Sequence, residues 1–145
     1  MIITNPKFRE IKISHAEEIL HFLIQSQDAF DILCVYEDIT FDPQLPKEIS
    51  KSFHDVIFFS IANYTLSTAT IQNEYLTFEA GFGEQNFGSF VKVPIENILQ
   101  ITQEDTPLFV NVTASLPKPK KPKNPFELNP RNKKILNPNS SQNSK

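Results

Sequence analysis

The sequence predicts a mainly β protein of the α+β class, in which one N-terminal helix precedes a small barrel or sandwich of short antiparallel strands. Apolar residues near the N-terminus recur with the spacing of one helical face. Short segments of alternating polarity then follow one another up to about residue 112, with turn residues between them. The last 31 residues, 115–145, are rich in lysine and proline and have neither pattern.

The helix is predicted over residues 14–28. Ser14-His15-Ala16-Glu17 has the form of a capping box, in which a serine and a glutamate satisfy the first backbone N–H groups. The apolar face that follows consists of Ala16, Ile19, Leu20, Leu23 and Ile24. Phe22 lies off this face, so it is a candidate for a second contact, either with the core or with another copy of the chain.

The strands are predicted from alternation and from the turn residues that separate them. Residues 56–61 are apolar on both faces, which predicts a central strand. Pro94 suits the first position of a single helical turn. The predicted strands are 32–36, 56–61, 66–71, 75–82, 90–93, 98–101 and 108–112.

The positions of the glycines predict a peptide-binding site. The chain has only three, with Gly81 and Gly83 at the end of the strand 75–82 and Gly88 in the loop that follows. A glycine in a strand marks either a bulge or a place where another backbone comes close. Because Ala80 and Gly81 are small, we expect an open surface here that accepts an extended peptide.

Five more residues are candidates for the same peptide site. Phe82, Ile61 and Leu108 are predicted to form either pocket walls or plain core. Asn63 and Tyr64 follow the strand 56–61 and are predicted to give polar contacts to the peptide or simply to form a turn.

The charge divides the chain into a domain over 1–114 and a tail over 115–145. The first part has 6 Lys and Arg against 16 Asp and Glu, a net charge of −10, whereas the tail has 8 against 1, a net charge of +7. Six prolines and the lack of apolar periodicity predict that the tail is disordered. Its short apolar groups, at 126–128 and in Lys133-Lys134-Ile135-Leu136, are either docking motifs or chance.

The residues that most enzymes and metal sites require do not cluster in the sequence. His15, His21 and His54 are scattered, and the single cysteine, Cys34, lies in an apolar run. We therefore predict a non-enzymatic protein without metal or cofactor. With no apolar run of membrane-spanning length and no signal pattern at the N-terminus, the sequence predicts a cytoplasmic protein without a membrane contact.

Three motifs in the same order and at similar spacing resemble the SspB family (stringent starvation protein B), bacterial adaptors that deliver tagged proteins to the ClpXP protease. They are Leu-Thr-Phe-Glu-Ala-Gly-Phe-Gly at 76–83, Val-Lys-Val-Pro at 91–94 and Ile-Leu-Gln-Ile at 98–101. The resemblance covers most of residues 14–112. Gly81 departs from the pattern, because members of the family often carry arginine there.

The resemblance implies a β-rich fold that holds an ssrA degradation tag extended in a groove. It implies that a basic and apolar motif in the tail binds the unfoldase ClpX, for which Lys133, Lys134, Ile135 and Leu136 are the candidates. Nine residues follow Leu136, whereas the family's tail often ends at its motif. Family members are commonly dimers in which N-terminal helices take part, which agrees with a homodimer contact at Phe22.

Two other functions remain open at this point. One is a small nucleic-acid-binding β-barrel with a basic tail, although the acidic domain would repel phosphate. The other is a general peptide-binding interaction module that uses the same groove for something other than a degradation tag.

Overall fold

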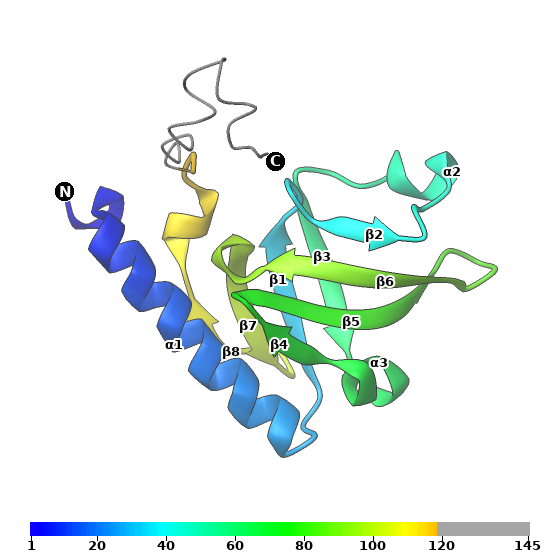
Figure 1. Cartoon of the computed structure of the whole chain (residues 1–145), viewed down its shortest axis with the longest axis horizontal. Coiled ribbons are helices and arrows are strands. Elements are labelled where there is room, and N and C mark those ends of the chain that lie inside the picture. The colour runs from blue at the N-terminus through cyan, green and yellow to red at the C-terminus, as the bar shows by residue number, and fades with distance from the viewer. Residues whose placement is uncertain (119–145) are drawn as a thin grey trace, which may run out of the picture.

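A computed structural model describes residues 1–118 of the chain and contains two four-stranded antiparallel sheets and an N-terminal helix, α1 (Pro6–Gln25) (Figure 1). The first sheet has the order β3 (Val56–Ile61), β1 (Phe30–Val35), β7 (Ile98–Gln103) and β8 (Thr106–Val110). The second has the order β2 (Thr40–Asp42), β6 (Phe87–Pro94), β5 (Tyr75–Phe82) and β4 (Thr70–Gln72). Short helical segments complete the fold: η1 (Ile2–Thr4), α2 (Lys47–Ser50), α3 (Asn63–Thr68), η2 (Ile95–Asn97) and η3 (Val112–Ser115). The predicted α+β class is confirmed.

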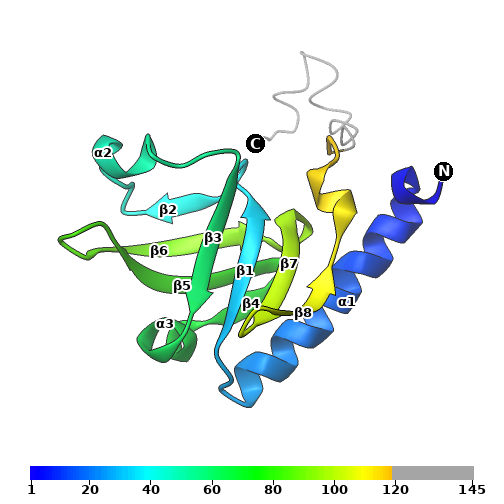
Figure 2. The same ribbon diagram turned by 180° about the vertical axis from the view of Figure 1, so that it is seen from behind.

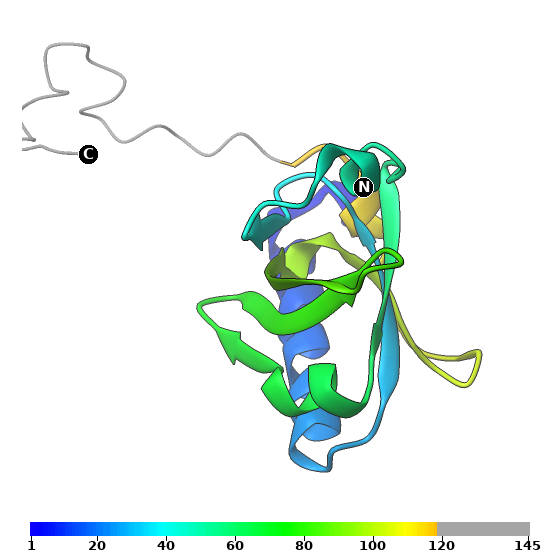
Figure 3. The ribbon, with the colours of Figure 1, turned by 90° about the vertical axis from the view of Figure 1, so that its right-hand side faces the viewer.

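The core lies between the two sheets, whose strands cross steeply (Figures 1 and 2). The rings of Phe59 on β3 and Phe78 on β5 meet edge to face with their centres 5.2 Å apart. The helix α1 adds Ala16, Leu20 and Leu23 to this core. In the side view, the tip of the β7–β8 hairpin extends away from the rest of the domain (Figure 3).

The helix α1 starts at Pro6, so the predicted start at Ser14 is wrong. The cap is Asn5, whose side-chain oxygen accepts a 2.8 Å hydrogen bond from the backbone N–H of Lys7. Pro6 then occupies the first helical position, where its missing N–H costs nothing. Ser14-His15-Ala16-Glu17 consequently lies inside the helix and caps nothing.

Residues 63–68 form the helix α3, and the predicted strand 66–71 is therefore wrong over most of its length. Hydroxyl groups in this segment bond back to backbone carbonyls, Ser67 to Tyr64 at 2.6 Å and Thr68 to Thr65 at 2.8 Å. Leu66 points into the core. Only Thr70–Gln72 is a strand, as β4.

The strand β3 lies at the edge of its sheet, although its apolar sequence predicts a central strand. Its residues alternate strictly between exposed and buried. Phe58, on the outer face, is 58% exposed. The short strand β2, next to β6, is not predicted at all from the sequence.

The described part of the chain ends in a set of polar contacts that includes Lys118. Its ammonium group lies 2.9 Å from Asp38 Oδ2 and 3.5 Å from Glu96 Oε2. Arg9 of α1 contacts Glu96 at 3.5 Å and donates a 3.0 Å hydrogen bond to the carbonyl of Thr113. Four residues of the predicted tail, 115–118, are thus described together with the domain. The predicted docking motifs at 126–128 and at Lys133, Lys134, Ile135 and Leu136 lie outside the described residues.

Candidate peptide-binding site

One edge of β5 is free over half of the strand. On one side, β5 pairs with β6 along its whole length, from Tyr75 opposite Pro94 to Phe82 opposite Phe87. On the other side, β4 pairs only with residues 75–77. Within residues 1–118, no strand pairs with this edge beyond Thr77.

The backbone groups on this edge belong to Glu79 and Gly81, and the N–H of Glu79 is already bonded within the chain. The N–H of Glu79 points to this side, because it donates a 2.9 Å hydrogen bond to Thr68 Oγ1 at the end of α3. Alternate residues of an antiparallel strand direct their N–H and C=O groups to the same side. Gly81 therefore directs its N–H and C=O toward the free edge as well.

A pocket of about 420 Å³ lies beside this edge, and we call it the β5 pocket. Two predicted site residues, Ala80 and Gly81, line it from β5, and a third, Tyr64, lines it from α3. The remaining lining residues come from β5, from β2 and the residue after it, and from β6 and the turn before it: Glu79, Asp42, Pro43, Asn86, Gly88, Ser89 and Phe90. The structure thus brings together three of the seven residues predicted for the peptide site.

Gly81 is exposed and lines the β5 pocket, but a flexible side chain lies over it. A Cβ atom built on Gly81 would collide with the side-chain amide of Asn86, which lies over this residue. Asn86 is exposed, in the turn between β5 and β6, with a positive φ of 54°. The bulge alternative for this glycine is wrong, because the register between β5 and β6 runs without a shift.

Tyr64 and Glu79 form a polar contact at the rim of the β5 pocket. The hydroxyl of Tyr64 donates a 2.7 Å hydrogen bond to Oε1 of Glu79. This hydrogen bond, and then the negative charge of Glu79, raise the pKa of Tyr64 above its ordinary value. The same hydrogen bond orients the Glu79 carboxylate.

Three other predicted residues do not line the β5 pocket. Ile61 is fully buried in the core, which is the plain alternative that its sequence position allowed. Phe82 packs against the rings of Phe41, Phe53 and Phe59, with centres 5.7 to 6.4 Å apart. Asn63 is exposed at the first residue of α3.

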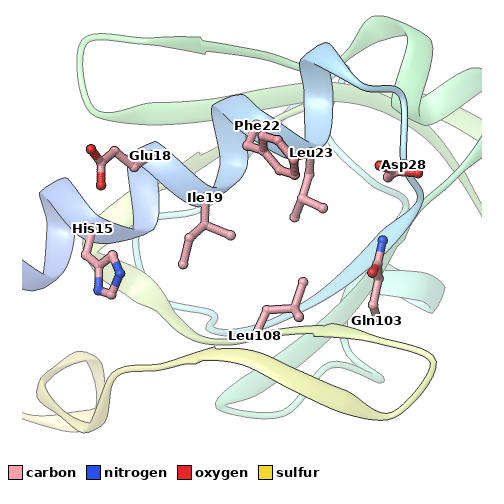
Figure 4. Close-up of a pocket in the computed structure, with 8 residues that line it drawn as sticks. All are labelled: His15, Glu18, Ile19, Phe22, Leu23, Asp28, Gln103 and Leu108. Atoms are coloured by element: carbon pink, nitrogen blue, oxygen red, sulfur yellow. The ribbon is translucent and has the colours of Figure 1, made fainter.

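Leu108 lies elsewhere, in a second pocket of about 510 Å³ between α1 and β8 (Figure 4). We call it the α1 pocket; its lining residues are His15, Glu18, Ile19, Phe22, Leu23, Asp28, Gln103 and Leu108. Phe22 is 68% exposed there, so the core alternative for Phe22 is wrong. Its apolar ring remains available to a partner.

Sequence reasoning missed Asp42, Asn86 and Phe90 as pocket residues. Asp42 belongs to β2, which the sequence does not reveal, because a three-residue strand before a proline has the signature of a loop. Phe90 starts a predicted strand, but its outward direction depends on the pairing of β6 with β2 and β5.

The thiol of Cys34 is fully buried, and burial raises its pKa, so the reactive thiolate is suppressed. Within residues 1–118, no three His, Cys, Asp or Glu side chains come together as a metal site requires. None of the helices described there has the length and apolar character needed to cross a membrane.

A scan of the chain against models of protein families finds no match, and a search of curated proteins finds none either. The likeness to the SspB family therefore rests on the motifs quoted from the sequence.

Proposed function

We propose that the protein is a non-enzymatic adaptor that binds ssrA-type degradation tags in the β5 pocket and delivers the tagged proteins to the ClpXP protease. The proposal rests above all on the free edge of β5 next to that pocket. An extended peptide that adds to a sheet edge gains main-chain hydrogen bonds, and its alternate side chains enter pockets. Gly81 supplies the backbone groups, and Ala80 beside it lines the same pocket.

The amide of Asn86 does not block such a peptide. It is the far end of an exposed side chain in a turn, so it can rotate away from Gly81. Its carbonyl and amino groups can then bond to the backbone of the incoming peptide. In this proposal the incoming peptide displaces the Asn86 side chain from Gly81.

The lysine-rich tail acts as a tether in this proposal. Linking two modest contacts makes the second one intramolecular, with an effective concentration in the millimolar range for a short flexible linker. The linker between Lys118 and Lys133 has 14 residues, and as the coil that its composition predicts it would span roughly 20 Å, from about 5–6 Å times the square root of its length. Such a span lets Lys133-Lys134-Ile135-Leu136 bind ClpX while the domain holds the tag.

Two copies of the chain pair through α1 in the same proposal. Phe22 is the most exposed large apolar side chain of α1, and with Ile19 and Leu108 it borders the α1 pocket. A second α1 placed against this pocket would remove these side chains from water, which favours association by about 25 cal/mol per Å² of apolar surface.

The direct test is binding of a fluorescein-labelled ssrA peptide to the full-length chain, followed by fluorescence anisotropy. We expect saturable binding that an unlabelled tag peptide competes away, and no binding of a peptide with the same residues in scrambled order. Equal binding of both peptides, or of neither, would refute the proposed function.

A further inference from the structure

Asp42, Phe90 and Glu79 form a row across three adjacent strands. Phe90 of β6 lies directly opposite Asp42 of β2 on one side and Glu79 of β5 on the other. Residues opposite one another in antiparallel strands point to the same face of the sheet, with Cβ atoms about 4.5–5.5 Å apart. An aromatic side chain is therefore flanked by two carboxylates on the outer face of the second sheet.

This row is open to solvent. Phe90 is 44% exposed, which is unusual for a phenylalanine in a paired strand, and both carboxylates are exposed. All three residues line the β5 pocket. The pocket thus has an apolar floor with negative charge on both sides.

No positive charge of the described residues neutralises the row. The lining of the β5 pocket contains no Lys, Arg or His. Lys92, two residues further along β6, places its ammonium group 4.4 Å from the centre of the Tyr75 ring, where it makes a cation–π contact. Among residues 1–118, the ion pairs involve Asp38 and Glu96 but neither Asp42 nor Glu79.

We infer that this row is the subsite for a basic side chain, arginine or lysine, of the bound peptide. The inference rests on the proposed function, and it adds the chemical class of the residue that the groove selects. A guanidinium group lying flat on the Phe90 ring gains a cation–π contact. Its N–H groups, which extend in the plane to both sides, reach carboxylates on either flank with charge-assisted hydrogen bonds.

The geometry favours a long basic side chain over a metal ion. The backbones of β2 and β5 stand two strand spacings apart, roughly 9–10 Å, with the Phe90 ring between the two carboxylates. A small cation needs its oxygen ligands within about 2.0–2.6 Å, with no apolar ring in between. The bond from Tyr64 further holds one oxygen of Glu79 and leaves Oε2 for the ligand.

The test uses the full-length chain and three sets of labelled ssrA peptides, in which each position in turn is replaced by Arg, by Ala or by Glu. Anisotropy titrations at low salt give the affinity of each peptide. At one position we expect Arg to bind about fivefold more tightly than Ala, and Glu to bind more weakly than Ala. The preference for Arg shrinks at high salt, since it is electrostatic.

Substitutions of Asp42 and Glu79 test whether these two carboxylates cause the preference for Arg. Asp42→Asn and Glu79→Gln are each expected to reduce the ratio of the Arg to the Ala affinity, and the double variant to abolish it. Glu104→Gln, in the turn between β7 and β8, makes the same change of charge away from the β5 pocket and should leave the ratio unchanged.

The outcomes of these titrations distinguish a failure of the basic subsite from a failure of the proposed function. If the parent tag binds but Arg, Ala and Glu are equivalent at every position, the basic subsite is refuted and the proposed function stands. If the Arg preference survives in the double variant, its assignment to Asp42 and Glu79 is refuted. If no peptide of any set binds, the proposed function fails, and the subsite fails with it.

Discussion

The hydroxyl of Tyr64, on α3, donates a 2.7 Å hydrogen bond to the carboxylate of Glu79, on β5. The two residues belong to different elements, and both line the β5 pocket. Beyond residue 77, β5 is therefore held on its free side by α3 through side chains, here and between Thr68 and the N–H of Glu79, and not by a strand ladder.

The Tyr64–Glu79 bond predicts that one tyrosine loses its proton at a higher pH than an ordinary tyrosine does. Because the bond and the charge of Glu79 raise the pKa of Tyr64, its contribution to stability is fully present below the ordinary tyrosine pKa of about 10 and is lost as the pH rises through the raised pKa. Tyrosinate absorbance followed to high pH measures this titration, and subtracting the Tyr64→Phe curve assigns it. Glu79→Gln removes the charge, so the midpoint of Tyr64 should fall. A midpoint that is the same in both backgrounds would contradict the hydrogen bond.

Ala80→Gln should abolish binding of the ssrA peptide, because Ala80 is one of the residues that line the β5 pocket. Anisotropy with the labelled peptide measures the loss. Ser60→Gln, an exposed position on β3, introduces the same amide away from the pocket and should bind normally. Ala80 is half-buried against the core, so thermal unfolding of both variants must accompany the measurement. Normal affinity in a folded Ala80→Gln protein would remove the pocket from the site.

Gly88→Leu tests the same pocket from the opposite strand at less risk to the fold. Gly88 lies opposite Gly81, and a Cβ added there meets no atom within 4 Å. The leucine side chain should occupy pocket volume and weaken peptide binding by about tenfold or more, which corresponds to about 1.4 kcal/mol. We expect the melting temperature to stay close to that of the unsubstituted chain. Unchanged affinity would argue that the peptide binds elsewhere.

Deleting residues 119–145 should leave peptide affinity unchanged and remove stimulation of ClpXP. All contacts described for the domain, up to the ion pairs of Lys118, remain in this variant. Degradation of an ssrA-tagged fluorescent protein measures delivery. Replacing Ile135 and Leu136 by serine in the full-length chain should have the same effect if that motif binds ClpX. Stimulation that survives the deletion would show that the tail is not the tether.

Phe22→Glu should convert a dimer into a monomer, because it places a charge in an apolar contact at α1. Light scattering coupled to size-exclusion chromatography measures the mass. Phe58→Glu is the matched control, since Phe58 is comparably exposed, at 58% against 68%, but lies on the outer face of β3. A monomeric unsubstituted chain, or equal dissociation in both variants, would rule out pairing through Phe22.

Local sequence patterns predicted the elements whose stability is local. Ala16, Leu20 and Leu23 recur at helical spacing and are buried as that spacing indicates. The start of α1 also has a local signal, with Asn5 as the cap and Pro6 at the first helical position, but Ser14-His15-Ala16-Glu17 has the form of a second cap eight residues further along. The local pattern alone does not decide between the two.

The residues of the candidate site were likewise predicted only where the sequence signal is local. Ala80, Gly81 and Tyr64 were found because small residues and turn residues follow rules within a few positions of the chain. Asp42 and Phe90 were missed, because only the register that sets β2 against β6 brings them into one row. Leu108 was assigned to the wrong pocket for the same reason: its strand pairs with β7, in the other sheet.

The contacts of Arg9 and Lys118 have a mechanical consequence. A pull on the chain beyond residue 118 would reach the domain through Lys118 and η3. The hydrogen bond from Arg9 to Thr113 passes part of that force into a 20-residue helix before it reaches β8, an edge strand that could otherwise peel away one bond at a time. Under the proposed function, these contacts would protect the domain from a force applied through its tail.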